Sequence, residues 1–64
     1  MYQAQFYKVD GIDQTDVGPP FGLAATTTDA AENEALLIAR PNGANFIKIL
    51  HNGRPVGERI GFAF

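Results

Sequence analysis

Polar and apolar residues alternate along residues 2–9, which is the period of an extended chain. The two sides of such a strand carry Ala4, Phe6 and Lys8 on one and Gln5, Tyr7 and Val9 on the other. Asp10-Gly11 follows directly, and both residue types favour turns. The pattern therefore predicts a strand over residues 2–9 in which neither face is wholly polar.

Residues 10–27 show no regular period. Gly18-Pro19-Pro20-Phe21-Gly22 lies in the middle of this segment. Because two prolines fix φ and lack a backbone donor, they favour an extended loop over a central strand. The spacing of a PxxP ligand is missing. We expect a rigid loop whose Phe21 fills the core, and we leave open whether residues 23–26 form a short edge strand.

Asp10, Asp13 and Asp16 stand three residues apart in the same segment. An EF-hand calcium loop needs acidic ligands two residues apart, a central glycine and a terminal glutamate. This segment lacks that register, so we interpret the aspartates as solvated turn residues.

A helical pattern begins near residue 29. Thr27, Thr28 and Asp29 offer side-chain oxygens to the free N–H groups of a first turn, and residues 30–39 are mostly good helix formers. At about 100° per residue, one face is apolar, formed by Ala31, Ala35, Leu36, Ile38 and Ala39. Pro41 stops the pattern. The sequence predicts a helix over residues 29–39.

Residues 44–64 have the pattern of a β-hairpin, because Asn52-Gly53 is a strong signal for a two-residue turn. That turn pairs His51 with Arg54, Leu50 with Pro55 and Ile49 with Val56. Proline cannot donate to a ladder, so the last strand is expected at a sheet edge. Gly57 suggests a bulge. A bulge leaves open which of Ile60, Phe62 and Phe64 face the core.

Together these elements predict one α+β domain over residues 1–64, in the order strand, loop, helix, strand, strand. A single helix packs on a small, mainly antiparallel sheet of three or four strands.

The chain has 64 residues, no cysteine and one histidine. A chain this short buries only about 60% of its unfolded surface and usually needs a disulfide, a metal or a partner. Cysteine is absent, and one imidazole cannot cage a metal alone. We therefore expect no cofactor and favour a homo-oligomer, and we leave open an unusually well-packed monomer.

Charge is divided unevenly along the chain. Residues 1–39 carry six acidic residues against Lys8, and residues 40–64 carry four basic residues against Glu58. This division can pair the two halves within one fold, pair two copies, or present a basic face to a polyanion. No apolar run approaches the roughly 20 residues that span a bilayer, and no leader pattern is visible, so we expect a cytoplasmic protein without membrane contact.

The layout resembles a family of short bacterial domains of unknown function. The resemblance is carried by Phe6, Asp10-Gly11, Asp16, Gly18, the helix ending in Ala39-Arg40, Phe46, Asn52-Gly53-Arg54 and Val56. It covers most of the chain. The long loop with Pro19-Pro20 departs from the family, as does the lack of its acidic-proline segment before the helix. The resemblance implies the layout and no activity.

The sequence favours a small protein-interaction module that acts by binding another protein. The candidate partner-binding residues are Leu37, Pro55, Phe62 and Phe64. Leu37 lies outside the apolar helix face, so it is either a simple exposed residue or a contact to a second subunit. The exposed edge of the hairpin is a template for strand pairing.

Two alternatives stay open. The first is a nucleic-acid or polyanion binder that uses Lys48, Arg54 and Arg59 of the hairpin, although the pI of about 5.0 opposes it. The second is a small enzyme or ligand carrier with its site between subunits. We expect no enzyme, because no serine or cysteine occurs in the chain and His51 belongs to a hairpin tip.

Overall fold

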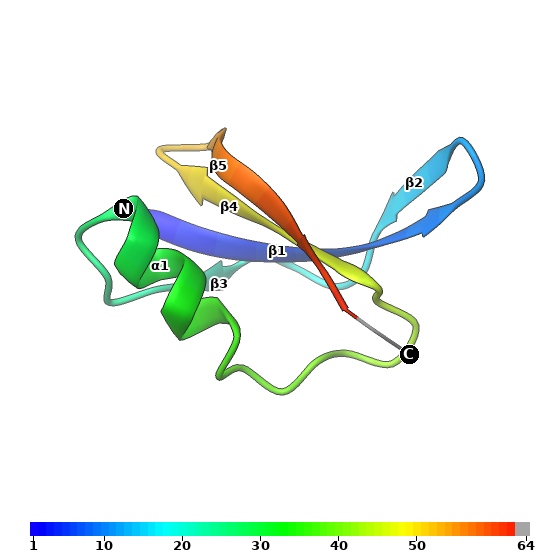
Figure 1. The fold of residues 1–64 in the computed structure, drawn as a ribbon, viewed down its shortest axis with the longest axis horizontal. Helices are drawn as coiled ribbons and strands as arrows, with labels where there is room; N and C mark the ends of the chain where they lie inside the picture. Colours follow the sequence, from blue (N-terminus) through cyan, green and yellow to red (C-terminus); the bar gives the residue numbers. More distant parts are fainter. Residues whose placement is uncertain (63–64) are drawn as a thin grey trace.

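The computed structural model describes residues 1–62 and contains one helix and one antiparallel sheet of five strands (Figure 1). The elements are β1 (Tyr2–Asp10), β2 (Asp13–Asp16), β3 (Phe21–Gly22), α1 (Thr28–Ala35), β4 (Phe46–His51) and β5 (Arg54–Gly61). The predicted α+β class, with one helix packed on a small antiparallel sheet, is confirmed. The sheet has five strands instead of three or four.

Both additional strands lie in the segment that was expected to be a loop. The strand order is β2-β1-β4-β5, and β3 pairs with β1 on the same edge as β2. β2 has no apolar residue and is exposed throughout, so no hydrophobic pattern marks it. Its pairing with β1 follows a two-residue turn, Gly11-Ile12, in which only Gly11 has positive φ (63°), the pattern of a type II′ hairpin.

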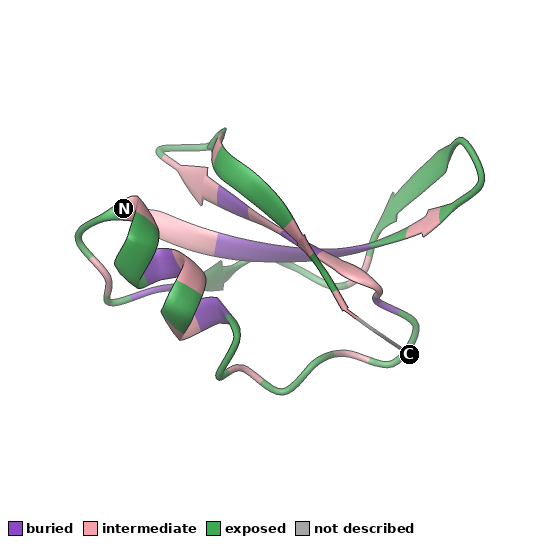
Figure 2. Cartoon of the chain, viewed as in Figure 1, coloured by how far each residue is buried: buried purple, intermediate pink, exposed green. Residues whose placement is uncertain are grey.

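The core lies between α1 and one face of the sheet (Figure 2). It comprises Ala4 and Phe6 of β1, Ile47 and Ile49 of β4, Ala31 and Ala35 of α1, and Leu23 and Ala44 of the loops. The two helical alanines are fully buried. Their small side chains let the helix backbone lie close to the sheet.

The helix is shorter than predicted. Thr27 is its N-cap, since its Oγ1 accepts a hydrogen bond from the Ala30 backbone N–H at 3.2 Å. The expected extension to residue 39 is wrong. Leu37 and Ile38 bond to carbonyls only three residues back, so the last turn tightens. Leu36 is left 52% exposed, although the helical pattern placed it on the apolar face.

The β4–β5 hairpin turns at Asn52-Gly53, as predicted. Both residues have positive φ (52° and 83°), and all three predicted cross-strand pairs are present. β5 is an edge strand, and its register shifts between Ile47 and Ile49 of β4. The predicted bulge is therefore present, with Gly57 at a φ of 67°.

Aromatic residues at the border of the core differ in their placement. Phe62 and Ile60 pack against the core cluster, while Phe64 lies outside the described residues. Phe21 is 39% exposed and meets the ring of Phe6 edge-on. Leu23 is buried in the core instead. Within residues 1–62, no helix is long and apolar enough to cross a membrane.

Candidate binding surface on the open sheet face

Within residues 1–62, no helix covers the sheet face that points away from α1, and we call this face the open face. Cross-strand register places Gln5 and Tyr7 of β1 beside Phe46 and Lys48 of β4 on this face. Gln5 and Tyr7 are nevertheless only 4% and 3% exposed. Their burial has to come from side chains and loops of the open face itself.

A loop covers Gln5. Its Nε2 donates to the carbonyl oxygens of Phe6 at 2.9 Å and of Gly18 at 3.0 Å. The Val17 backbone N–H donates to the same Phe6 carbonyl. These bonds satisfy the buried amide nitrogen and hold the chain between β2 and β3 along β1.

Four side chains form an aromatic–cation cluster, which consists of Tyr7, Phe46, Lys48 and Arg59. The rings of Tyr7 and Phe46 stack with centroids 5.6 Å apart. Lys48 Nζ lies 5.4 Å from the Tyr7 centroid, and Arg59 Cζ lies 4.8 Å from the Phe46 centroid. Both cations are within the roughly 6 Å at which a ring attracts a positive charge.

The two cations differ in their other partners. Lys48 Nζ also lies 3.6 Å from Asp16 Oδ1 of β2. Arg59 has no hydrogen bond or ion pair with any of residues 1–62, and it is exposed. A guanidinium that rests on a ring keeps N–H donors at its edge for a carboxylate or phosphate. Among residues 1–62, Arg59 is therefore a cation held over a ring with its N–H donors unused.

Two glycines of β5 make this arrangement possible. Three residues of β5, Gly57 to Arg59, lie opposite Lys48 alone, because Ile47 pairs with Ile60 and Ile49 with Val56. The bulge brings Arg59 next to Lys48. Gly61 pairs with Phe46, and a Cβ there would lie 2.9 Å from Phe46 Cε1. The ring occupies the space that a side chain would take.

The structure brings together only part of the predicted polyanion set. Lys48 and Arg59 share the open face. Arg54 lies beside the hairpin turn, opposite His51, whose ring stacks on Tyr2 at 4.2 Å on the helix side of the sheet.

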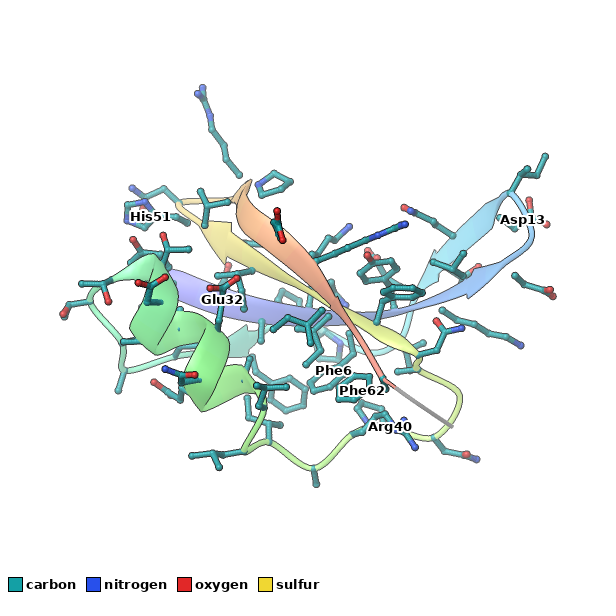
Figure 3. All side chains as sticks on the ribbon, in the orientation of Figure 1. Phe6, Asp13, Glu32, Arg40, His51 and Phe62 are labelled. Atoms are coloured by element: carbon teal, nitrogen blue, oxygen red, sulfur yellow. The ribbon has the colours of Figure 1, made fainter. Side chains whose placement is uncertain are left out.

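The four candidate partner-binding residues do not form one surface. Leu37 is 87% exposed in the turn after α1, and Pro55 is exposed on β5. Phe62 is half-buried and stacks on Phe6 at 6.2 Å, with Arg40 Cζ 5.0 Å from its ring on the other side (Figure 3). Phe64 lies outside the part of the chain that the structure describes.

Sequence reasoning missed Tyr7 and Asp16 as members of the candidate surface. Alternation did separate Tyr7 from Phe6, and this was the available signal. The pairing of β1 with β4, which puts Tyr7 beside Phe46, joins segments about 40 residues apart and left no local signal.

The hairpin of residues 10–16, which we call the acidic arm, projects beyond the rest of the sheet (Figure 1). Asp10 and Asp13 face each other as the last cross-strand pair. Ile12 at the tip is fully exposed. Among residues 1–62, no group of three or more His, Cys, Asp or Glu side chains is placed to hold a metal ion.

A hollow of about 530 Å³ lies along the loop before β4 and is lined by residues 40–45. The lining includes Arg40, whose guanidinium rests on Phe62. The other lining residues are one proline, two asparagines, one glycine and one alanine. These groups offer neither a nucleophile nor a proton-transfer pair.

A scan against protein-family profiles and searches of curated proteins and of solved structures found no match. The resemblance to short bacterial domains therefore stays a prediction.

Proposed function

We propose that this chain is a small binding module that docks another protein through its open face. Arg59 carries the proposal: it is exposed, it is ordered on the ring of Phe46, and it has no carboxylate partner within the described chain. Aromatic and arginine side chains dominate the energetics of protein interfaces. Because the Phe46 ring already restrains the Arg59 guanidinium, the Arg59 side chain loses less conformational entropy when a partner binds.

A protein partner suits this face better than a nucleic acid. Base stacking needs an uncovered aromatic ring. Tyr7 is only 3% exposed, and Lys48 and Arg59 already lie over the two rings. The net charge of −2 also opposes a nucleic acid, which carries a charge on every nucleotide, more than a protein that presents single carboxylates. The cytoplasmic location and the homo-oligomeric state stay predictions from the sequence.

The test is a titration followed by two-dimensional amide NMR, with three probes: a Glu/Ala peptide, its Lys/Ala counterpart, and oligothymidylate. We expect the acidic peptide to shift signals of Phe46, Lys48 and Arg59, and the basic peptide to leave these three signals unchanged. Arg59→Ala should weaken binding about tenfold or more, since a hydrogen-bonded charge contributes about 1.5–3 kcal/mol.

Arg54→Ala is the matched control, because it removes the same charge from the same strand but away from the open face. Equal losses in both variants would show nonspecific attraction and reject the site. Tighter binding of oligothymidylate than of the acidic peptide would replace the proposal with the nucleic-acid alternative. An unchanged spectrum with every probe would reject the proposed function.

A further inference from the structure

We propose that the open face receives the acidic arm of a second copy of this chain. This inference rests on the proposed function and names the partner. Two features of one molecule are complementary: an arm with unneutralised carboxylates and an apolar tip, and a face with an ordered arginine beside aromatic rings.

The acidic arm is locally unfavourable by itself. Asp10 and Asp13 are directly opposite each other, and like charges in that position destabilise a strand pair. The described chain places no cation in an ion pair with either of them. Ile12 between them is fully exposed. A partner cation that approaches the tip would relieve the repulsion, and an apolar surface beside it would cover the isoleucine.

The open face supplies both groups. Arg59 offers N–H donors that no acceptor among residues 1–62 uses, and Phe46 beneath it is only partly buried. An arginine fork matches the geometry of a carboxylate, so Asp13 or Asp10 can take both donors at once. Ile12 would then lie against the half-buried Phe46 ring. The third aspartate, Asp16, is already used by Lys48 of its own chain.

The arm cannot reach the open-face arginine of its own molecule. β2 and β5 are the opposite edges of the sheet, separated by β1 and β4. Figure 3 shows Asp13 at the far end of the projecting hairpin. A second molecule is therefore required, and the contact joins two different surfaces, arm to face. Each contact uses the arm of one copy and the face of the other, which is a heterologous association.

Sedimentation velocity at low salt tests the inference on the full chain. We expect the mass of the wild-type protein to rise with concentration and to return to that of a monomer at about 1 M salt, where charges are screened beyond about 3 Å. Asp13→Lys and Arg59→Glu should each be monomeric when alone. Melting curves should show that both variants fold, since both positions are exposed.

The decisive sample is the equimolar mixture of the two variants. Asp13→Lys keeps an intact face and Arg59→Glu keeps an intact arm, so association should return in the mixture although neither variant associates alone. The reversed arm and the reversed face also carry opposite charges, so the result to score is the return of association and not a fixed stoichiometry. Arg54→Glu, the matched charge reversal on β5, should associate like the wild type. Leu37→Glu should do so too.

A monomeric wild type at millimolar concentration and low salt would overturn the inference. A mixture that stays monomeric, or loss of association in Leu37→Glu, would overturn it as well. These failures are separable from failure of the proposed function, because binding of the acidic peptide to the open face does not require self-association.

Discussion

At the residue scale, the side chain of one asparagine makes the two backbone hydrogen bonds that a paired strand residue would make. Asn45 precedes β4, yet its side chain pairs with the backbone of Val9 in both directions. Asn45 Oδ1 accepts from the Val9 N–H at 2.8 Å, and Asn45 Nδ2 donates to the Val9 carbonyl at 3.0 Å. Its backbone N–H donates to the Tyr7 carbonyl oxygen, and its backbone carbonyl accepts from the Phe62 N–H. The amide thereby extends the ladder between β1 and β4 toward the acidic arm.

Asn45→Asp should destabilise the protein by about 1–3 kcal/mol, because a carboxylate cannot donate to the Val9 carbonyl and leaves that group unsatisfied. Urea unfolding measures the change. Asn42→Asp is the control, since Asn42 is exposed in the neighbouring loop and should shift stability by less than about 0.5 kcal/mol. Equal effects in the two variants would mean that the side-chain pairing contributes nothing.

Gly61 determines the position of the Phe46 ring. Gly61→Ala would place a Cβ 2.9 Å from Phe46 Cε1, so the ring must move. We expect a cost of about 1–3 kcal/mol, as for other overpacked sites, and weaker binding of the acidic peptide because Arg59 loses its support. Gly22→Ala is the control: its Cβ would have no atom within 4 Å and its φ is ordinary. Thermal melting compares the two, and a Gly61→Ala protein as stable as the control would refute the packing argument.

At the element scale, α1 is too short to be stable alone. Isolated helices shorter than about 12–15 residues are marginal in water, and α1 has 8. Tertiary contacts have to hold it. Besides the buried alanines, Glu34 contributes: its carboxylate accepts hydrogen bonds from the backbone N–H groups of Ala24 and Ala25 at 3.0–3.1 Å. This ties the helix to the segment that follows β3.

Glu34→Gln should lower the free energy of unfolding by about 1–2 kcal/mol, because charge-assisted hydrogen bonds are about twice as strong as neutral ones. In addition, the NH₂ group of the glutamine cannot accept a hydrogen bond. Glu58→Gln is the matched control, since Glu58 is exposed on β5 and makes no ion pair with any described residue. Chemical denaturation compares the pair. If Glu58→Gln costs as much as Glu34→Gln, the tether is not the cause.

The elements also show what the sequence could and could not predict. The β4–β5 turn, its register, the bulge at Gly57 and the edge position of Pro55 follow from local chemistry, and each is present. β2 escaped prediction because an all-polar strand has no hydrophobic period and forms by backbone pairing. The predicted helix end was wrong because residues 36–39 are good helix formers, yet Leu37 and Ile38 bond to carbonyls three residues back, and no residue type before Pro41 marks this earlier end.

The candidate surface likewise contains residues that the sequence could identify and residues that only the fold brings together. Lys48 and Arg59 could be selected from the sequence because they are basic residues on a predicted hairpin. Their assembly with Tyr7 and Asp16 depends on two strand pairings, β1 with β4 and β1 with β2. No local pattern encodes such partners. The acidic arm was visible only as three spaced aspartates, and its projection from the sheet required the fold.

At the scale of the whole molecule, the chain combines a packed body with a projecting arm. In the body, α1 covers one face of β1 and β4, whose central residues Phe6, Ile47 and Ile49 are essentially inaccessible to solvent. In the arm, β2 is exposed at every position. Regions with few buried contacts open without global unfolding. The two parts should therefore differ in stability even though they share the strand β1.

Hydrogen exchange measures this difference directly. Ladder amides of β1 and β4 near Phe6 and Ile47 should exchange only through global unfolding. Ladder amides of the acidic arm, residues 10–16, should exchange about tenfold faster or more, because local opening of the arm costs less free energy. Raising the protein concentration at low salt should then slow exchange in the arm of the wild type and leave the arm of Arg59→Glu unchanged, since only the wild type offers a face for docking. Equal protection of arm and body in dilute protein would show that the arm unfolds together with the body. If exchange in the arm of the wild type does not change with protein concentration, the arm is not the occupant of the open face.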